Sequence, residues 1–355
     1  MKQSINLKIA LAYWFIHFSV EALCFFCLFS LFQGGKYWWM MSLLYDTLAF
    51  APQAAIGSFY EKHPKLSPGP PGGLLLLAGA ALMLIGSRLT VGPIYLAAEV
   101  IGLLLLTVGN CIEHIAGAFE TLKASEGRLS ESAIFVGGGS FGVITGRLLS
   151  SDVRLFPIPF ALMIAATLIT VYVQAEDNNF TEKPCRQNIA KNISVGFVVV
   201  VLCTVVIVRG YIGYGLPTAW NQTTIQTVFL FCFMGLGKMA GGLLADRFGP
   251  RKTGIFSCLA AVPLLLVSDH IMWLSLIAVA LFSMTMAITL GGLVSVLPRN
   301  PGIAFGVTTL GLLLGTLPTF FFPMPGRLVC NILIVILSAA AAFGLWITLK
   351  PDTAG

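Results

Sequence analysis

The sequence predicts an all-α membrane protein of twelve transmembrane helices. Of its 355 residues, 57% are hydrophobic and only 10% are charged, and the mean hydropathy is +0.89. Soluble globular domains have a far more polar composition. Apolar segments of roughly twenty residues, the length that crosses a bilayer, recur along the whole chain. Composition and spacing therefore exclude a soluble globular protein.

The twelve expected helices follow one another through short polar turns. The first comes after a short basic N-terminus and is too long for the core of a signal peptide. The third and fourth are separated only by the turn from Arg88 to Pro93. The expected spans are 8–32, 37–59, 70–89, 92–117, 130–150, 155–174, 193–216, 222–245, 252–268, 271–296, 302–322 and 327–349.

The distribution of basic residues predicts the orientation of the chain. With the N-terminus inside, fourteen Lys and Arg residues fall in inner segments and four in outer turns. This positive-inside bias favours an N-in, C-in topology. The net charge of +6 is then a consequence of topology, so we expect a lipid bilayer and no nucleic acid as partner. Compact size and short loops favour a monomer in a bacterial cytoplasmic membrane.

The longest polar segment divides the helices into two sets of six. It covers residues 174–192, so we expect bundles at 1–174 and 193–355 joined by an inner linker at 175–192. A weak internal repeat supports a duplication. Gly57 and the acid-base pair Glu61-Lys62 follow the second helix at the same interval as Gly242 and Asp246-Arg247 follow the eighth.

A glycine-rich apolar helix runs into a charged turn between Gly235 and Lys252. Small residues in this helix permit close approach of a neighbouring backbone. The charged residues cannot stay in hydrocarbon, so the helix must reach the membrane surface here. Gly249 and Pro250 then end the helix.

This stretch resembles the signature loop of the major facilitator superfamily, in which a glycine precedes Asp-Arg-x-Gly-x-Arg-Lys between two transmembrane helices. The matching residues are Gly242, Asp246, Arg247, Gly249, Arg251 and Lys252, with Pro250 where a basic residue is common. The resemblance implies two six-helix bundles and rocker-switch alternating access around a mid-membrane cavity. It also implies that these residues form a gate that holds the eighth helix against a neighbour, with Lys238 as a further member.

Several ionisable or polar residues lie inside predicted spans, where a charge costs about 2.5–3.5 kcal/mol. His17 and Glu21 are four residues apart and share one helix face. A carboxylate beside an imidazole in a cavity is a candidate proton site, although a purely structural pair is the alternative. The full set proposed for the substrate and proton pathway is His17, Glu21, Asp46, Asn110, Glu113, His114, Arg147, Arg209, Tyr211 and Tyr214.

The fourth helix carries Asn110, Glu113 and His114 on about one face. Together with the first helix it offers two histidines and two carboxylates, which is also a donor set for a divalent cation. No HxxxH spacing supports that alternative, and Cys24-x-x-Cys27 lies within an apolar helix without a nearby second pair, so a structural role is expected for it. We therefore expect no metal site and no cofactor.

Two arginines have different expected roles. Arg209, deep in the seventh helix, is expected to bind an anionic substrate group or to act as counter-ion of Glu21, with Tyr211 and Tyr214 nearby. Arg147, nearer the outer face, is expected to pair with Asp46 or Glu21, or to extend to the membrane surface.

Glycines recur every fourth residue in the fifth helix, at Gly138, Gly142 and Gly146. The run resembles the glycine motif of superfamily antiporters, with Val143 in place of the usual proline. This resemblance favours export. Close helix packing is the expected physical role of these glycines and of their counterparts at 302, 306, 311 and 315.

These observations predict a secondary active transporter for a small organic solute, with proton-coupled efflux as the favoured mode. The alternatives are an uptake symporter or facilitator for a small, possibly anionic metabolite, and a membrane sensor that does not transport. No Walker A pattern is present, so energy is expected from an ion or solute gradient. No nucleophile and base stand at a coherent spacing, so an enzyme is not expected.

Overall fold

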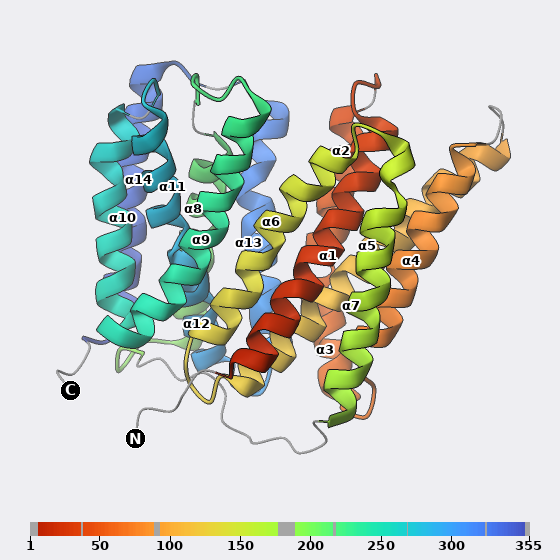
Figure 1. Cartoon of the computed structure of the whole chain (residues 1–355). Helices are drawn as coiled ribbons and strands as arrows, with labels where there is room; N and C mark the ends of the chain where they lie inside the picture. Colours follow the sequence, from red (N-terminus) through yellow and green to blue (C-terminus); the bar gives the residue numbers. More distant parts are fainter. Residues whose placement is uncertain are drawn as a thin grey trace.

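The computed structural model describes residues 6–36, 38–88, 93–176, 189–215, 218–267, 269–323 and 325–351 (Figure 1). For residues 93–96, 174–176, 214 and 215 it describes the backbone alone. These ranges contain fourteen α-helices and one short 3-10 helix. The only strand-like pairing among them is an isolated bridge between Ile189 and Leu349. The all-α prediction is therefore confirmed.

The first half of the chain forms seven α-helices, which lie on the right in Figure 1. They are α1 (Leu7–Phe32), α2 (Trp38–Phe50), α3 (Gln53–Lys62), α4 (Gly69–Gly86), α5 (Pro93–Ala124), α6 (Ser130–Leu149) and α7 (Pro157–Glu176), with the 3-10 helix η1 (Val153–Leu155) before α7. The second half forms α8 (Val195–Gly215), α9 (Thr224–Phe248), α10 (Pro250–Val267), α11 (Met272–Ser283), α12 (Thr285–Val296), α13 (Pro301–Phe321) and α14 (Arg327–Thr348).

Two of the twelve predicted spans are broken helices, which is why fourteen are observed. The segment expected at 37–59 is divided into α2 and α3 at Ala51 and Pro52, where proline supplies no backbone N–H. The segment expected at 271–296 is divided at Met284, whose N–H bonds the carbonyl of Leu281 in a tighter turn. Eleven stretches, one of them Met272–Val296, are long and apolar enough to cross a membrane. The pair α2 and α3 supplies a twelfth, broken crossing.

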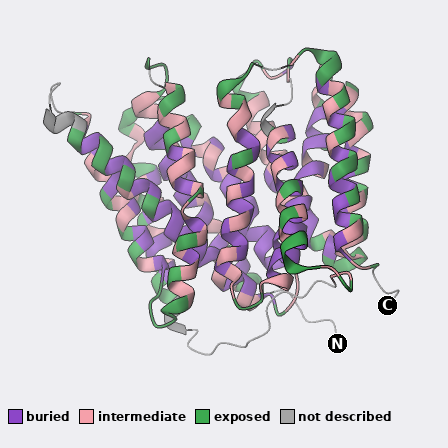
Figure 2. Ribbon diagram, turned by 180° about the vertical axis from the view of Figure 1, so that it is seen from behind, coloured by how far each residue is buried: buried purple, intermediate pink, exposed green. Residues whose placement is uncertain are grey.

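The surface of the molecule is apolar where the helices face outward. Figure 2 shows exposed residues on the outer faces of the helices and buried residues between them. Large exposed side chains include Leu168 and Val200, each 65% exposed, and Phe256, 64% exposed. Side chains of this kind are stable against lipid and unfavourable against water. The chain is therefore a multi-pass membrane protein.

The chain ends lie on one side of the molecule, because α1 begins and α14 ends on the same side (Figure 1). This side is called the termini side. The predicted boundary between two bundles at 175–192 falls mostly on residues 177–188, outside the described ranges. The division into two bundles stays a prediction, as does the N-in, C-in orientation.

The glycines of α6 bring its backbone against α1. A Cβ atom at Gly138 would collide with the carbonyl oxygen of Trp14, and one at Gly142 would lie 2.8 Å from the Cβ of Glu21. At Gly146 it would lie 2.8 Å from the backbone nitrogen of Phe26. The predicted packing role of this face is confirmed, and the contact holds α1 in one register beside α6.

We predict that Gly146→Ala destabilises the protein, because the new methyl group has no space between α6 and α1. The cost of overpacking is about 1–3 kcal/mol, which lowers the melting temperature of the purified protein. Gly196→Ala is the matched control, since no atom lies within 4 Å of its Cβ position. That control should keep or raise the melting temperature, because alanine favours helix. Equal melting temperatures for the two variants would contradict this packing.

Candidate functional site

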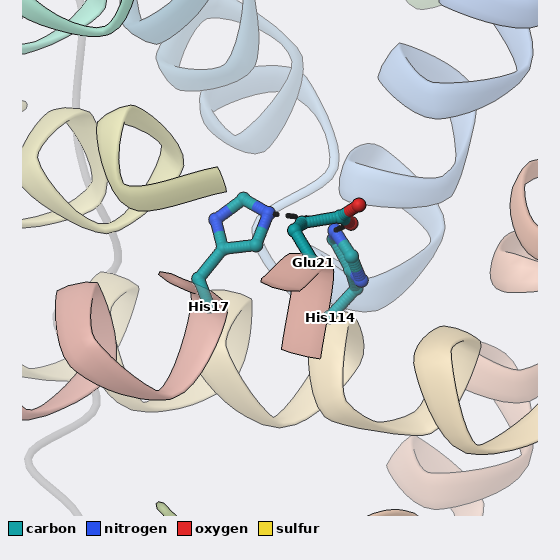
Figure 3. A group of neighbouring side chains, drawn as sticks. All are labelled: His17, Glu21 and His114. Atoms are coloured by element: carbon teal, nitrogen blue, oxygen red, sulfur yellow. Dashed lines mark ion pairs between the residues drawn. The ribbon is translucent and has the colours of Figure 1, made fainter. Parts of the chain in front are cut away.

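Three ionisable side chains meet in the middle of the helices. Glu21 is the fifteenth residue of α1, about 21 Å along its axis from Leu7. Its Oε1 lies 3.8 Å from Nε2 of His17 on the same helix and 3.4 Å from Nε2 of His114 on α5. Figure 3 shows the two imidazole rings on either side of the carboxylate. All three side chains are buried, and they are called the His-Glu-His cluster.

Backbone carbonyls hold both imidazole rings in one tautomer. Nδ1 of His17 lies 2.9 Å from the carbonyl oxygen of Phe135, and Nδ1 of His114 lies 2.9 Å from that of Asn110. A carbonyl oxygen only accepts, so each Nδ1 is the protonated donor. In each neutral ring the lone pair is therefore on Nε2, the atom nearest Glu21.

Asn110 of α5 connects the cluster to α2. Its Nδ2 donates to Oε1 of Glu21 at 3.3 Å and to the hydroxyl of Tyr45 at 3.1 Å, and it lies 3.6 Å from Sγ of Cys24. The neighbour of Tyr45 in α2, Asp46, is half-buried, and its charge acts on Glu21. Asn110, Glu113 and His114 were expected on one face of α5, but only Asn110 and His114 contact Glu21.

Glu113 faces away from this cluster. A Cβ atom at Gly72 of α4 would lie 3.0 Å from Cγ of Glu113, which places the glutamate against the start of α4. It is 1% exposed, and neither carboxylate oxygen has a hydrogen-bond partner among the described residues. Glu113 therefore lies outside the site that its neighbour His114 joins.

Lys238 of α9 links the second half of the chain to this region. Its Nζ donates to Oγ of Ser140 on α6 at 2.9 Å. Ser140 follows Gly139, where a Cβ atom would collide with Nε2 of His17, so the ammonium of Lys238 lies near the His-Glu-His cluster. The expected place of Lys238 in the gate is wrong, because it lies two turns before Asp246 and bonds the middle of α6.

Arg209 of α8 lines a cavity with Lys238. The cavity has a volume of about 60 Å³, and its other walls are mostly apolar side chains such as Phe282 and Met286. Arg209 is 8% exposed, and its charge acts on Lys238. The cavity therefore brings two cationic side chains, one from α8 and one from α9, to one place.

The remaining predicted pathway residues are less central. Arg147 is exposed, and its guanidinium lies 5.4 Å from the ring centre of Phe29. It makes no ion pair with Asp46 or Glu21 in the described part of the chain. Tyr211 is half-buried and does not line the cavity of Arg209. The side chain of Tyr214 lies outside the described residues.

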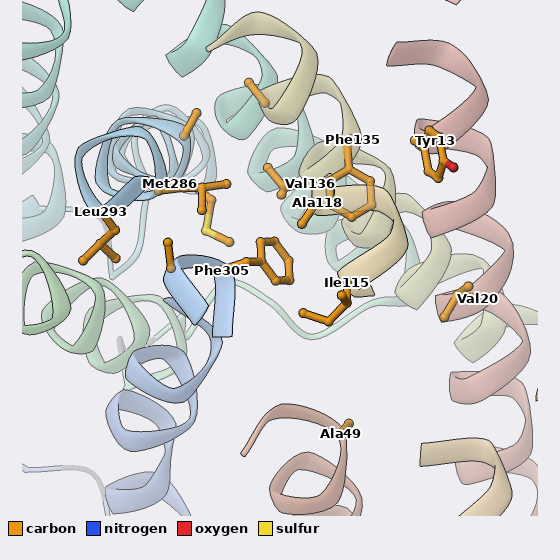
Figure 4. Packing of buried hydrophobic residues seen from close by; sticks show 14 of the residues in the cluster. Tyr13, Val20, Ala49, Ile115, Ala118, Phe135, Val136, Met286, Leu293 and Phe305 are labelled. Atoms are coloured by element: carbon orange, nitrogen blue, oxygen red, sulfur yellow. The ribbon is translucent and has the colours of Figure 1, made fainter. Parts of the chain in front are cut away.

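An aromatic layer separates the His-Glu-His cluster from the termini side. Phe135 of α6 and Phe305 of α13 have ring centres 6.1 Å apart. Phe135 also contacts His17 and Phe305 contacts His114, at 4.8 and 6.3 Å between ring centres. Figure 4 shows these two rings within a buried apolar group that includes Met286 and Ile115. Both rings are buried and lie between the cluster and the helix starts on this side.

The end of α9 is bound to the start of α6 on the termini side. The carboxylate of Asp246 accepts from the backbone N–H of Leu129 at 2.8 Å and of Ser130 at 2.9 Å, and from the Ser130 hydroxyl. These N–H groups have no partner within α6 because they begin the helix. A negative charge there is also favoured by the helix dipole. This set of contacts is called the α9 latch.

A second, equivalent contact binds the end of α3 to the start of α13. The carboxylate of Glu61 accepts from the N–H of Gly302 at 2.7 Å, from the N–H of Ile303 at 3.4 Å and from Nδ2 of Asn300 at 3.1 Å. The helices touch closely here, because a Cβ at Gly57 would lie 2.6 Å from the carbonyl carbon of Gly302. This set is called the α3 latch.

The glycine and acid of the internal repeat have the same roles in both latches. Gly242 precedes Asp246 by four residues, as Gly57 precedes Glu61. A Cβ at Gly242 would lie 2.7 Å from the carbonyl oxygen of Leu129. Each latch therefore combines a close backbone approach with a carboxylate at a helix N-terminus.

Two basic residues of the predicted gate lie against aromatic rings. Arg247 is exposed, with its guanidinium 5.1 Å from the ring centre of Phe248. Arg251 lies 5.4 Å from the ring centre of Trp346 on α14, and the adjacent Lys252 is exposed in α10. Gly249 has a positive φ of 97°, which permits the turn between α9 and α10.

Comparisons with known proteins agree on one architecture. No family model matches the sequence, and no curated protein sequence matches it significantly. Among solved structures, the transporter FucP in an outward conformation matches at a TM-score of 0.66 and 16% identity, over 96% of this chain and 99% of that one. FucP is described elsewhere as the fucose:proton symporter of E. coli.

Two further structures match over nearly their full lengths. One is a bacterial homologue of the iron transporter ferroportin in an outward-facing state, with a TM-score of 0.63, 12% identity, and 97% and 98% of the two chains covered. The other is the human organic anion transporter MFSD10, with a TM-score of 0.63, 14% identity, and 97% and 100% covered. The chain has the major facilitator fold.

Within the major facilitator fold, sequence reasoning located the right helices but missed several partners. Glu61, Ser140 and Tyr45 were not placed in the site or the gate by pattern alone, and Lys238 was expected in the gate rather than beside Ser140. For Glu61 the signal was present in the internal repeat, which aligns it with Asp246. Phe135 and Phe305 carried no signal, because an apolar ring in a membrane helix is unremarkable by composition.

We predict that the two latches protect different backbone amides from hydrogen exchange. Asp246→Asn removes a charged acceptor worth about 0.5–2 kcal/mol at a helix N-terminus, so exchange in peptides covering 128–131 should rise about 2- to 30-fold. Glu61→Gln should do the same for peptides covering 301–304. Each variant serves as the control for the other. Hydrogen exchange is measured by mass spectrometry on purified protein. Unchanged exchange at both helix starts would exclude this role of the carboxylates.

Proposed function

We propose that this chain is a secondary active transporter that moves a small organic solute across the membrane by alternating access. The observation that carries the proposal is a group of buried ionisable residues that lies beyond two helix-to-helix latches on the termini side. Two latches and the Phe135–Phe305 layer close the termini side, and the His-Glu-His cluster lies beyond them. Groups of this kind inside a membrane protein mark ion and substrate pathways.

The orientation that we propose is N-in, C-in in a bacterial cytoplasmic membrane, with the protein as a monomer. The termini side is then cytoplasmic, as the excess of basic residues on this side supports. The conformation described is then outward-facing. The FucP and ferroportin-homologue structures that match are also described as outward.

We propose that Glu21 carries the coupling proton, with His17 and His114 as its partners. Two imidazole nitrogens and an amide surround one carboxylate oxygen, so the charge of Glu21 decides whether the group attracts or repels Lys238. Lys238 bonds α6 from α9. A proton on Glu21 therefore changes an interaction between the two halves of the chain, which is the requirement for coupling.

The substrate that we propose carries an anionic group. Arg209 and Lys238 line one cavity whose other walls are largely apolar. A guanidinium binds a carboxylate or phosphate through two parallel hydrogen bonds, and a cavity of about 60 Å³ has room for such a group rather than for a whole metabolite.

Proton-coupled efflux is the direction that we propose, supported by the antiporter-like glycine run of α6. Uptake by symport uses the same cavity and the same cluster, and the sign of flux under an imposed pH gradient separates the two. A sensor would bind the solute without moving it. Flux into or out of proteoliposomes containing only this protein excludes the sensor.

We predict that Glu21→Gln abolishes accumulation or depletion driven by a pH gradient in proteoliposomes. The amide has nearly the same shape but does not exchange a proton, so solute exchange in the absence of a gradient should continue. Glu120→Gln is the control, because this buried α5 glutamate pairs with Lys123 on its own helix. Wild-type gradient-driven flux in Glu21→Gln would refute the coupling role.

We predict that small organic carboxylates and phosphates raise the melting temperature of the protein, whereas their neutral analogues do not. Arg209→Met should weaken binding of the responding anion about 10- to 150-fold, since a hydrogen bond to a charged group contributes about 1.5–3 kcal/mol. Arg88→Met, an exposed arginine at the end of α4, is the control. Equal affinities in both variants would place the anion elsewhere.

A further inference from the structure

The His-Glu-His cluster presents three lone pairs to one point. Nδ1 of each histidine donates to a backbone carbonyl, so the lone pair of each Nε2 is directed toward the carboxylate of Glu21 (Figure 3). The three candidate donor atoms lie within 4.8 Å of one another. Two nitrogen lone pairs facing an anionic oxygen repel unless a cation lies between them.

The spacing of these atoms fits a metal ion better than direct hydrogen bonds. A bond between imidazole and carboxylate has a length of about 2.7–2.9 Å, but the Nε2 to Oε1 distances are 3.4 Å for His114 and 3.8 Å for His17. Ligand atoms at about 2.1 Å from a tetrahedral metal are about 3.4 Å apart. The ion therefore fits between these atoms with small side-chain movements.

The groups around the cluster are those that orient metal ligands. Metal-binding histidines donate their other ring nitrogen to a carbonyl or carboxylate, as both rings do here. Asn110 orients the glutamate from behind. The absence of a side chain at Gly139 leaves room for the His17 ring, because a Cβ atom there would collide with it.

We propose that His17, Glu21 and His114 form a binding site for one divalent transition-metal ion of the zinc class. Two imidazoles and one carboxylate are a donor set that such ions prefer over Mg²⁺ or Ca²⁺. Three protein ligands leave a fourth position for water or a solute group. The site uses the same atoms as the coupling site proposed above, but metal binding does not require transport and is measured without it.

Lys238 adds a feature that a generic metal site lacks. Its Nζ bonds Ser140, and the preceding residue, Gly139, packs against Nε2 of His17, so this ammonium opposes a second cation in the cluster. Replacing Lys238 should therefore strengthen metal binding, whereas replacing a ligand weakens it. These opposite effects distinguish this site from any other metal-binding position on the protein.

The sequence predicted no metal site, because no single segment has the spacing of a metal-ligand motif. Here His17 and Glu21 come from α1 and His114 from α5, ninety-three residues after Glu21. Packing of α1 beside α5 brings them together. The glycines of α6 fix the register of α1 in this arrangement. A motif search along one helix does not detect such a site.

The test uses full-length protein without a histidine tag, in which the other two histidines, both exposed, are replaced by His63→Ala and His270→Ala. Titration with Zn²⁺ is followed by calorimetry, and with Co²⁺ by its visible absorption. The expected result is one ion per chain with a tetrahedral cobalt spectrum. His17→Ala, His114→Ala and Glu21→Gln should each weaken binding at least about tenfold, and Lys238→Met should tighten it.

Absence of stoichiometric binding in the His63→Ala, His270→Ala protein would overturn the proposal, as would binding that the three cluster variants leave unchanged. If a ligand variant fails to fold, Lys238→Met still tests the position of the site. An unchanged zinc affinity in Lys238→Met would place the ion away from the cluster and overturn the proposal. Proton-driven transport without zinc binding would overturn the metal site and leave the proposed function intact. Zinc binding without any transport would do the reverse.

Discussion

The structure depends on two carboxylates that each bind the start of a helix in the opposite half of the chain. Glu61 and Asp246 occupy helix ends where backbone N–H groups lack partners and where the dipole favours negative charge. Each contact is exchangeable, because water can replace the carboxylate once the helices move apart. A pair of polar latches on the termini side thus joins helices from the two halves of the chain without a large apolar interface there.

Depth in the membrane separates the roles of the other groups. Nearest the termini side are the latches, then the aromatic layer of Phe135 and Phe305, then the His-Glu-His cluster. Lys238 reaches from α9 to Ser140 at the level of that cluster. In the mechanism that we propose, an ion on Glu21 changes the charge balance between the two halves, and the latches set how readily the halves separate. Binding and closure would then be linked through shared helices rather than through direct contact.

Hydropathy predicted eleven of the spanning segments as long apolar stretches, because in a bilayer composition and length determine a helix almost alone. The glycine pattern likewise predicted close packing of α6, although not that α1 is its partner. The cluster was only half predictable. The four-residue spacing of His17 and Glu21 indicated that they share one helix face. Glu113 and His114 are adjacent in α5, however, and only the rotation of that helix decides which of them meets Glu21. The breaks at Pro52 and Met284 and the reach of Lys238 depend on neighbours that no local pattern contains.

The central claim is that the latches hold the termini side closed and that their release opens it. Spin labels at Lys62→Cys and Arg299→Cys, in a background without native cysteines, report the separation of α3 from α13 in proteoliposomes, because both positions are exposed beside the α3 latch. The account predicts that adding Glu61→Gln and Asp246→Asn together shifts the distance distribution measured by double electron–electron resonance to longer values. A distribution identical to that of the latched protein would contradict it.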